Sequence, residues 1–457
     1  MKYGNSKIAR FLLTSVFFLL SQHVLLSQDT LRIDLDEFIR AGIKRSSRLE
    51  LERNNVQLSE NRVDNIRANK ILPDFSITSN HGVLPSPAGE VTDPAENFTI
   101  DWSNLEIFTR VEFRLLQPIT TWGAINKGMD AAKHLVKVEQ AKLLQKERTE
   151  EQQLFELYQS RILTDHLKAL VLDADDKLEE AKSKLDDMLD DGEDVSYKQI
   201  YQLKLFEQEF SIQKAELFEQ LAYIEDMWGL LLREEYPNKV VLPKLTQMNS
   251  LDQPLFNLND LINHAQSYSV EALIARELIK AAELGIESKK ASFIPMMYLG
   301  LGGEYVRTPI PVAQQPLLGN RNNFANVFYS FGFRVNLNFS KIRADLNKSR
   351  IELNQAKDAR RAASQLKFFE VREAFKNFQI AKETRDKNQT SLDLANEWLR
   401  QEQIDFDLEI GELNHLIDAV KATMQYKVAV ARSIQGYNSA LIELYLKTGY
   451  SVTSFKF

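Results

Sequence analysis

The chain has 457 residues, of which 44% are hydrophobic and 26% are charged, so it carries enough apolar surface for a folded core and lacks the composition of a disordered protein. Its formal net charge of −7 at pH 7 shows no basic excess, which argues against a general nucleic-acid-binding protein. No cysteine is present, which excludes disulfides, thiolate metal sites and a lipidated N-terminal cysteine.

The first residues have the pattern of a secretory signal peptide. Basic residues precede the apolar run 11–20, and Ser27 follows at the usual distance for cleavage by signal peptidase. An N-terminal membrane anchor is disfavoured because Gln22 and His23 interrupt the run before it reaches about 18 apolar residues. We therefore expect residues 1–27 to be removed.

The longest predicted element is a helix over about 122–191, a stretch without proline. At 1.5 Å per residue, about 70 residues would make a helix ~105 Å long, which predicts an elongated molecule. In its second half, apolar residues recur in steps of three and four, the spacing of a seam for partner helices. They are Leu163, Leu167, Leu170, Ala174, Leu178, Ala181, Leu185 and Met188.

A shorter helix, from about Leu35 to Lys70, is expected before the long one, and Pro73 ends it. Two strand candidates, 75–80 and 107–116, follow with a proline-rich loop between them. A return helix over about 197–232 is expected after the long helix.

The same order of elements then begins again, which predicts a duplicated unit of about 220 residues. The second set comprises a helix over 258–291, strands 297–305 and 327–339, a long helix over 342–406 and a return helix over 413–447. The segments 123–128 (GAINKG) and 344–349 (ADLNKS) match locally. We expect the first repeat to occupy residues 28–245 and the second 246–457.

The helix lengths predict a rod. In the first half the two shorter helices together span ~110 Å, close to the ~105 Å of the long helix, so they can stack end to end beside it. The predicted fold class is mainly α with a small β part: long helical hairpins with strands at one end and helical turns at the other.

The strands pose a closure problem. No stretch after the signal peptide is apolar and long enough for a transmembrane helix, so any membrane-spanning part must be β. Four strands per chain are too few, because the smallest membrane barrels use about eight; two or more chains must therefore pool their strands, and three would supply about twelve. The alternative is a small soluble sheet packed on helices.

Taken together, these features resemble the TolC family of outer-membrane efflux and secretion proteins over the whole mature chain. The matching features are the repeated element order, the prolines that open the strands, Gln117-Pro118, and the segments 406–411 and 416–419. The resemblance implies a homotrimer with a twelve-stranded barrel in the outer-membrane lipid of a Gram-negative bacterium and a helical tunnel in the periplasm. It also implies docking to a periplasmic adaptor (membrane fusion protein) and an inner-membrane pump, of RND or ABC type. The pump type and the exported substrate stay open.

The resemblance also suggests a gate. In this family, inward carboxylates narrow the periplasmic end of the tunnel in a segment similar to Asp-Val-Leu-Asp-Ala. Here the segment begins at His415, where an acid is expected, while Asp418 matches the last acid and Gly411 stands where an arginine is common. A weaker or pH-sensitive gate is one expectation, because imidazoles change charge near neutrality. The alternative is that His415 is an ordinary surface residue.

Acidic residues surround the first hairpin turn. The candidate docking residues for an adaptor are Asp190, Asp191, Gly192, Glu193 and Asp194, with Glu409 at the second turn. A calcium loop is rejected because non-ligating residues fall at ligand positions. A solvated acidic turn and electrostatic guidance of a basic adaptor both stay open.

Charged residues also occupy one face of the strands. Arg110, Glu112, Arg114 and Arg334 alternate with apolar neighbours. They line a watery lumen in one interpretation and form cross-strand ion pairs in the other.

No motif supports catalysis, a cofactor or a metal site: there is no nucleophile elbow, no Walker loop, and no histidine spacing suited to zinc. Two functional hypotheses remain. The first is a passive outer-membrane exit duct of a tripartite efflux or type I secretion system. The second is a secreted coiled-coil scaffold or adhesin whose strands form a cap.

Overall fold

The computed structural model describes residues 30–71, 74–88, 99–190, 196–237, 239–252, 257–308, 323–335, 337–408 and 410–452. The predicted signal peptide lies outside them. The chain divides into two compact units, and each unit takes segments from both halves of the sequence. We call Met1–Ser47, Glu147–Asn263 and Phe369–Phe457 the hairpin unit, and Arg48–Lys146 with His264–Phe368 the strand unit.

The helices recur in the predicted order. The first half holds α2 (Leu35–Arg45), α3 (Ser47–Ile71), α4 (Ala124–Asp190) and α5 (Tyr197–Leu232); the second holds α6 (Leu258–Tyr268), α7 (Val270–Ala291), α8 (Phe339–Asp407) and α9 (Leu413–Thr448). The prediction of long helices and return helices is confirmed. With 67 and 69 residues, α4 and α8 are each about 100 Å long.

The prediction of one unbroken helix before each strand pair is wrong. In both halves an 11-residue helix is followed by a break at a serine with extended backbone, Ser46 (ψ 108°) or Ser269 (ψ 155°). Ser269 starts α7 by accepting a hydrogen bond from the Ala272 amide at 3.3 Å, the role that serine favours at a helix N-terminus. The break recurs at equivalent places, which supports the internal duplication.

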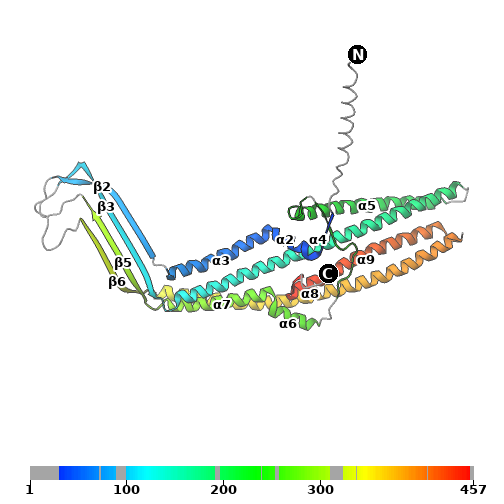
Figure 1. Ribbon diagram of the computed structural model, residues 1–457. Helices are drawn as coiled ribbons and strands as arrows, with labels where there is room; N and C mark the ends of the chain where they lie inside the picture. Colours follow the sequence, from blue (N-terminus) through cyan, green and yellow to red (C-terminus); the bar gives the residue numbers. More distant parts are fainter. Residues whose placement is uncertain are drawn as a thin grey trace, which may run out of the picture. The chain divides into compact units, whose positions relative to one another are not determined.

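In the hairpin unit, α4 and α5 form one helical hairpin and α8 and α9 another (Figure 1). The predicted seam on α4 is buried at Leu163, Leu167, Ala174, Leu178 and Leu185. Near the helical turns, Leu178, Leu185 and Leu203 of the first hairpin pack with Ile417 of the second. The seam therefore holds two hairpins together, as its spacing predicts.

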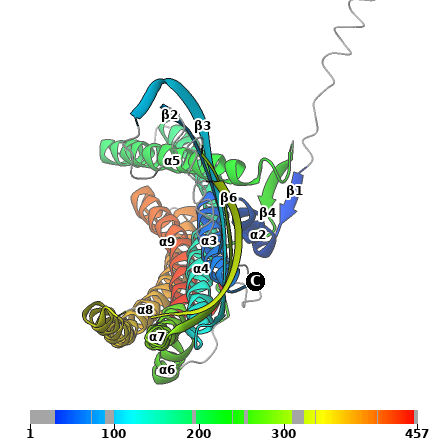
Figure 2. The same ribbon diagram turned by 90° about the vertical axis from the view of Figure 1, so that its left-hand side faces the viewer.

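A two-stranded parallel sheet, absent from the sequence prediction, organises the main core of this unit. Strand β1 (Thr30–Ile33) pairs with β4 (Val240–Pro243) beside α2 (Figure 2). The Trp228 indole stacks on Phe38 with ring centroids 4.2 Å apart, and its N–H donates to the Val241 carbonyl at 2.8 Å. Each strand has four residues, too few for an alternating pattern to be recognised.

In the strand unit, four antiparallel strands form one sheet in the order β2-β3-β5-β6 (Figure 1). They are β2 (Asp74–Ala88), β3 (Thr99–Thr120), β5 (Met296–Arg307) and β6 (Asn323–Arg334). The four-strand prediction is confirmed, but β6 ends before Phe339, which belongs to α8. Asn338 stops the strand pattern because its side chain accepts a hydrogen bond from the Lys341 amide at 3.1 Å and so starts the helix.

The turn from β3 into α4 is held at several points. Trp122 has φ of 51° and Gly123 has φ of 86°, so the chain makes two left-handed steps before the helix begins. The Trp122 indole N–H donates to the Pro295 carbonyl at 2.7 Å, and the Ser288 hydroxyl donates to the Ala124 carbonyl at 2.7 Å. These bonds fix the start of α4 against the second half of the chain and compensate for the strained tryptophan backbone.

Candidate functional site

The sheet of the strand unit has two chemically different faces. Residues paired across antiparallel strands share a face, and the register places odd-numbered residues of all four strands on one side. That side, the apolar face, exposes large side chains: Phe75, Ile77, Val83, Ile107, Leu299, Leu301, Tyr305, Val327, Tyr329, Phe331 and Phe333. These side chains lie side by side and form one continuous apolar patch. Single apolar residues scattered over a protein surface are ordinary, but a continuous patch marks a surface that contacts lipid or another protein.

The opposite side, the polar face, brings the predicted lumen residues together. Glu112 lies directly opposite Glu304, and the Arg110 guanidinium is 2.7 Å from both carboxylates. Arg114 and Arg334 have no acidic group within ion-pair distance among the described residues; Arg334 instead lies 5.7 Å from the centre of the Tyr298 ring. The contact between Arg110 of β3 and Glu304 of β5 is a cross-strand ion pair, whereas Glu112 lies on the same strand as Arg110. Arg114 and Arg334 present open positive charges.

Both edges of this sheet are unpaired in the described part of the chain. Strands β2 and β6 lie at the two ends of the strand order and each pairs with one neighbour. Glycines on β5 leave room for aromatic rings: a Cβ on Gly302 would lie 2.5 Å from the Phe328 ring. The outer edges of β2 and β6 present unpaired backbone N–H and C=O groups to which another strand can add.

The helical turns hold the predicted docking and gate residues. Asp190 is exposed at the end of α4, whereas Asp191, Gly192, Glu193, Asp194 and Glu409 lie outside the described residues. Asp418 is exposed on α9 between the buried residues Ile417 and Ala419. The His415 side chain is 60% exposed, and its Nδ1 lies 4.0 Å from Oε2 of Glu402 on α8.

Gly411 has a structural role that the sequence does not reveal. Its N–H donates to the Asp405 carbonyl at 2.9 Å, and a Cβ at this position would lie 2.8 Å from the Phe406 nitrogen. Only glycine allows this close approach of the backbone. The residue therefore shapes the turn between α8 and α9.

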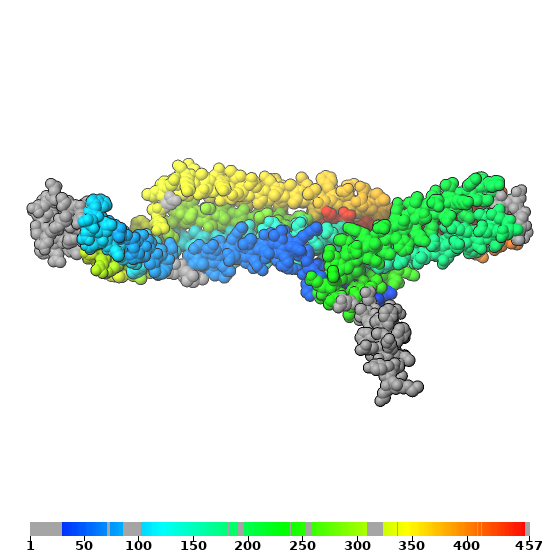
Figure 3. Space-filling model, turned by 90° about the horizontal axis from the view of Figure 1, so that it is seen from above, coloured from blue at the N-terminus to red at the C-terminus, as the bar shows by residue number. Residues whose placement is uncertain are grey.

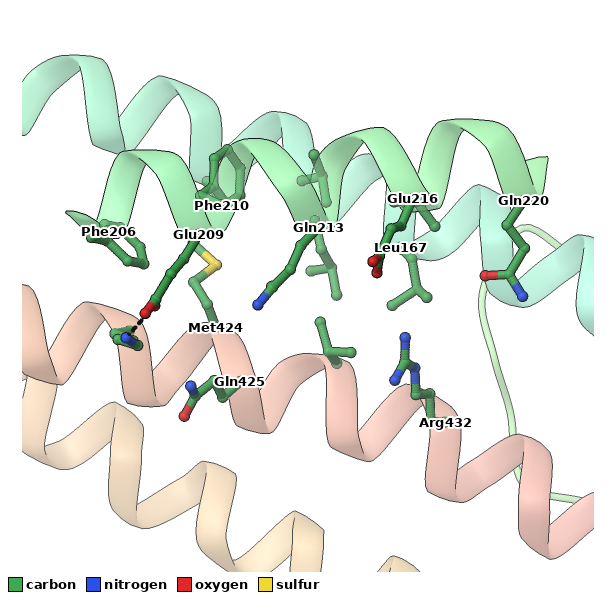
Figure 4. Close-up of a pocket in the computed structure, with 16 residues that line it drawn as sticks. Leu167, Phe206, Glu209, Phe210, Gln213, Glu216, Gln220, Met424, Gln425 and Arg432 are labelled. Carbon is green, nitrogen blue, oxygen red and sulfur yellow. Dashed lines mark hydrogen bonds and ion pairs between the residues drawn. The ribbon is translucent and has the colours of Figure 1, made fainter. Parts of the chain in front are cut away.

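A groove of about 410 Å³ separates the two hairpins of the hairpin unit. Figure 4 shows Leu167 from α4, Phe210 from α5 and Met424 from α9 around it. The groove is crossed by an ion pair in which Lys421 Nζ of α9 is 2.6 Å from Glu209 Oε2 of α5.

A second ion pair joins Lys427 of α9 to Asp173 of α4 at 3.4 Å. The partners in these two pairs are 212 and 254 positions apart in the sequence. Sequence reasoning missed them because no local pattern signals pairs at such separations.

The described ranges lack a membrane-spanning helix and a cluster of metal-ligating side chains. No helix there is both long and apolar enough to cross a membrane. No three histidine, aspartate or glutamate side chains gather there as the ligands of a metal ion would.

The sequence matches no family model and no curated protein sequence, but the fold matches solved structures over nearly its whole length. The open-state MtrE outer-membrane channel of Neisseria gonorrhoeae has a TM-score of 0.71 at 14% identity, covering 92% of this chain and 89% of that one. The CmeC outer-membrane channel of Campylobacter jejuni has a TM-score of 0.68 at 12% identity, covering 91% and 85%. The outer-membrane protein VceC of Vibrio cholerae has a TM-score of 0.67 at 12% identity, covering 91% and 96%. The chain therefore has the fold of the TolC-family outer-membrane channels.

Proposed function

We propose that three copies of this chain form an outer-membrane channel that passively conducts substrates delivered by a periplasmic adaptor and an inner-membrane pump. The observation that carries the proposal is the four-stranded sheet with one apolar face, one charged face and two open edges. In a closed barrel every edge is paired, the apolar face meets lipid, and the charged face lines the lumen. Three copies would supply about twelve strands.

Unpartnered apolar stripes on the helices also support association of copies. On α5 the exposed residues Tyr201, Ile212 and Tyr223 recur every 11 residues, which places them within about 40° of each other on a helix. Figure 3 shows α5 (green) at the front of this view with no other described element over it. On α8 a similar stripe includes Ile380 and Leu394. A neighbouring copy would cover both stripes.

The channel hypothesis and the scaffold or adhesin hypothesis differ in location and in conduction. We expect the mature protein to remain in the Sarkosyl-insoluble outer-membrane fraction and to form stepwise conducting channels in planar lipid bilayers. A water-soluble monomer without affinity for detergent or lipid would contradict the channel and favour the scaffold.

The polar face is the proposed lumen wall. Since Arg110 is neutralised by two carboxylates, Arg114 and Arg334 are the positive groups that a permeating ion would meet. Arg114→Gln with Arg334→Gln should move the reversal potential in a salt gradient toward cation preference. Arg307→Gln, which removes one positive charge from the apolar face of the same sheet, is the control for each single substitution and should not move it.

The acidic residues around the first turn, Asp190 to Asp194, together with Glu409 at the second, are the proposed contact for an adaptor with basic residues. Attraction between exposed charges is screened by salt. Binding of the purified channel to its adaptor should therefore weaken as ionic strength rises, and salt-independent binding would remove this assignment. Whether the pump is of RND or ABC type is decided by identifying the protein that cross-links to this complex.

A further inference from the structure

The apolar face of the sheet carries a single charged residue where the strands pair in regular register. Over residues 75–85 of β2, residues 105–117 of β3 and along β5 and β6, the odd-numbered positions include one lysine, arginine, aspartate or glutamate, and it is Arg307 at the end of β5. Asp101, the charged odd-numbered residue of β3, lies beyond the register shift between Pro85 and Ser86. Its exposed side chain has no ion-pair partner among the described residues.

Arg307 stands in a row of polar residues that crosses the whole sheet. Its register partners are Thr109 on β3 and Asn323 on β6, and Thr109 pairs in turn with His81 on β2. The His81 ring links the row through hydrogen-bond contacts, with Nδ1 3.1 Å from the Thr109 hydroxyl and Nε2 2.8 Å from the Ser79 hydroxyl. The row therefore groups a guanidinium with hydroxyl and imidazole groups on an otherwise apolar surface.

The position of Arg307 along β5 places it where a membrane boundary would lie if the apolar face meets lipid. A lipid-facing arginine is most unfavourable at the midplane of a bilayer and close to neutral at the interface. From Met297 to Arg307 on β5 is a run of ~33 Å along the strand, and at a tilt of about 40° it spans ~25 Å, the height of the apolar band of a membrane barrel. With Met297 at the boundary nearer the helices, Arg307 lies at the boundary farther from them.

The chemistry of this row suits a phosphate group. Arginine binds phosphate through two parallel N–H groups, and hydroxyl groups add further hydrogen bonds. Toward the centre of the band, Tyr305 and Val327 continue the apolar surface with exposed side chains, on which an acyl chain can lie. A phosphorylated headgroup above acyl chains matches both parts of this surface.

We propose that Arg307, with Thr109 and His81, binds the phosphate of a phosphorylated glycolipid in the outer leaflet of the membrane. This inference rests on the proposed function, because it requires the apolar face to meet lipid and the helices to lie on the periplasmic side. On that orientation the row faces the external leaflet, where phosphorylated glycolipid replaces ordinary phospholipid.

The test is a lipid titration of the full-length trimer purified in detergent and followed by native mass spectrometry. We expect up to one diphosphorylated lipid A molecule per subunit, and Arg307→Gln should weaken its binding about tenfold, the effect of losing one charge-assisted phosphate contact. Arg307→Lys should bind with intermediate strength because it keeps the charge and loses the paired N–H groups. Arg334→Gln, on the polar face, is the matched control and should bind as the wild type does.

Three results would overturn the proposal: equal binding by Arg307→Gln and the wild type, equal binding of dephosphorylated lipid A, or equal binding of phosphatidylglycerol. Conductance in planar bilayers separates this failure from failure of the channel itself. If Arg307→Gln conducts normally and still binds lipid A like the wild type, the lipid site is wrong and the channel stands. If the wild type neither inserts nor conducts, the proposed function fails first.

Discussion

Glu277 is a buried carboxylate whose charge is held by its neighbours. Its side chain is 5% exposed on α7, and Oε2 lies 2.5 Å from Nδ1 of His134 on α4. Burial alone would raise the pKa of Glu277, but the hydrogen bond from His134 and the charges of Lys280, His134 and Lys137 outweigh it and hold the pKa below its ordinary value of 4.5.

Because the pKa of Glu277 is lowered in the folded protein, its ionised carboxylate stabilises the fold at neutral pH and not at low pH. A carboxylate with a lower pKa in the folded state stabilises the fold above its unfolded pKa, and the contribution disappears as pH falls through the folded pKa. Glu277→Gln should lower the stability at neutral pH by about 1 to 3 kcal/mol, and the difference from wild type should shrink below pH 4.5. Thermal unfolding followed by circular dichroism measures it, with the exposed Glu283→Gln as control. A pH-independent difference would contradict the explanation.

Asp418 is the residue at which the family resemblance suggests a gate. In a trimer three copies of this exposed carboxylate would repeat around one axis. His415 lies on the same helix, with its Nδ1 4.0 Å from Oε2 of Glu402. Asp418→Ala should raise single-channel conductance, whereas Asp393→Ala, an exposed acid elsewhere on the same hairpin, should not. Conductance of Asp418→Ala equal to wild type would end the gating role.

Among the secondary-structure elements, the prediction succeeded where a pattern is long and periodic. The strand alternation around Phe113 and around Phe331, and the seam through Leu167, led to elements that the structure contains. It failed where a single side chain decides: Asn338 ends a strand pattern by starting a helix, and Ser269 breaks a helical pattern by capping the next one. Such local hydrogen bonds compete with the helix or strand that the spacing of apolar residues predicts, and that spacing does not reveal them.

Two ion pairs connect α9 of the second hairpin to the helices of the first hairpin. Lys421 with Glu209 and Lys427 with Asp173 are partly exposed, so each contributes at most about 1 kcal/mol and weakens with salt. The double variant Lys421→Ala with Lys427→Ala should separate the hairpins more readily and raise the open fraction in single-channel recordings at low salt.

The chain provides a control for this effect. Lys387 pairs with Glu383 on the same helix. Lys387→Ala therefore removes one lysine and its ion pair without breaking a link between the hairpins, and it should leave the open fraction unchanged. High salt should bring the wild type closer to the double variant. If the double variant and the wild type opened equally often at low salt, these pairs would have no part in holding the hairpins.

At the scale of the whole molecule, the open edges of the sheet and the exposed apolar stripes on α5 and α8 are all surfaces that neighbouring copies of the chain would cover. Ile212 is 60% exposed on α5, and a charge there would face apolar side chains in an assembled trimer. Ile212→Asp should yield monomers in detergent by light scattering coupled to size exclusion, while Ile212→Val should stay trimeric. An intact Ile212→Asp trimer would show that α5 lies outside the contact.

The small parallel sheet of β1 and β4 has a consequence for biogenesis. Thr30 pairs with Val240, and the same core contains Ile442 and Val452 from the end of the chain. Since ribosomes make β1 first, its backbone groups and Ile33 wait without their partners while about 200 further residues are added. The core that includes Ile33 is therefore completed only after most of the chain has been made.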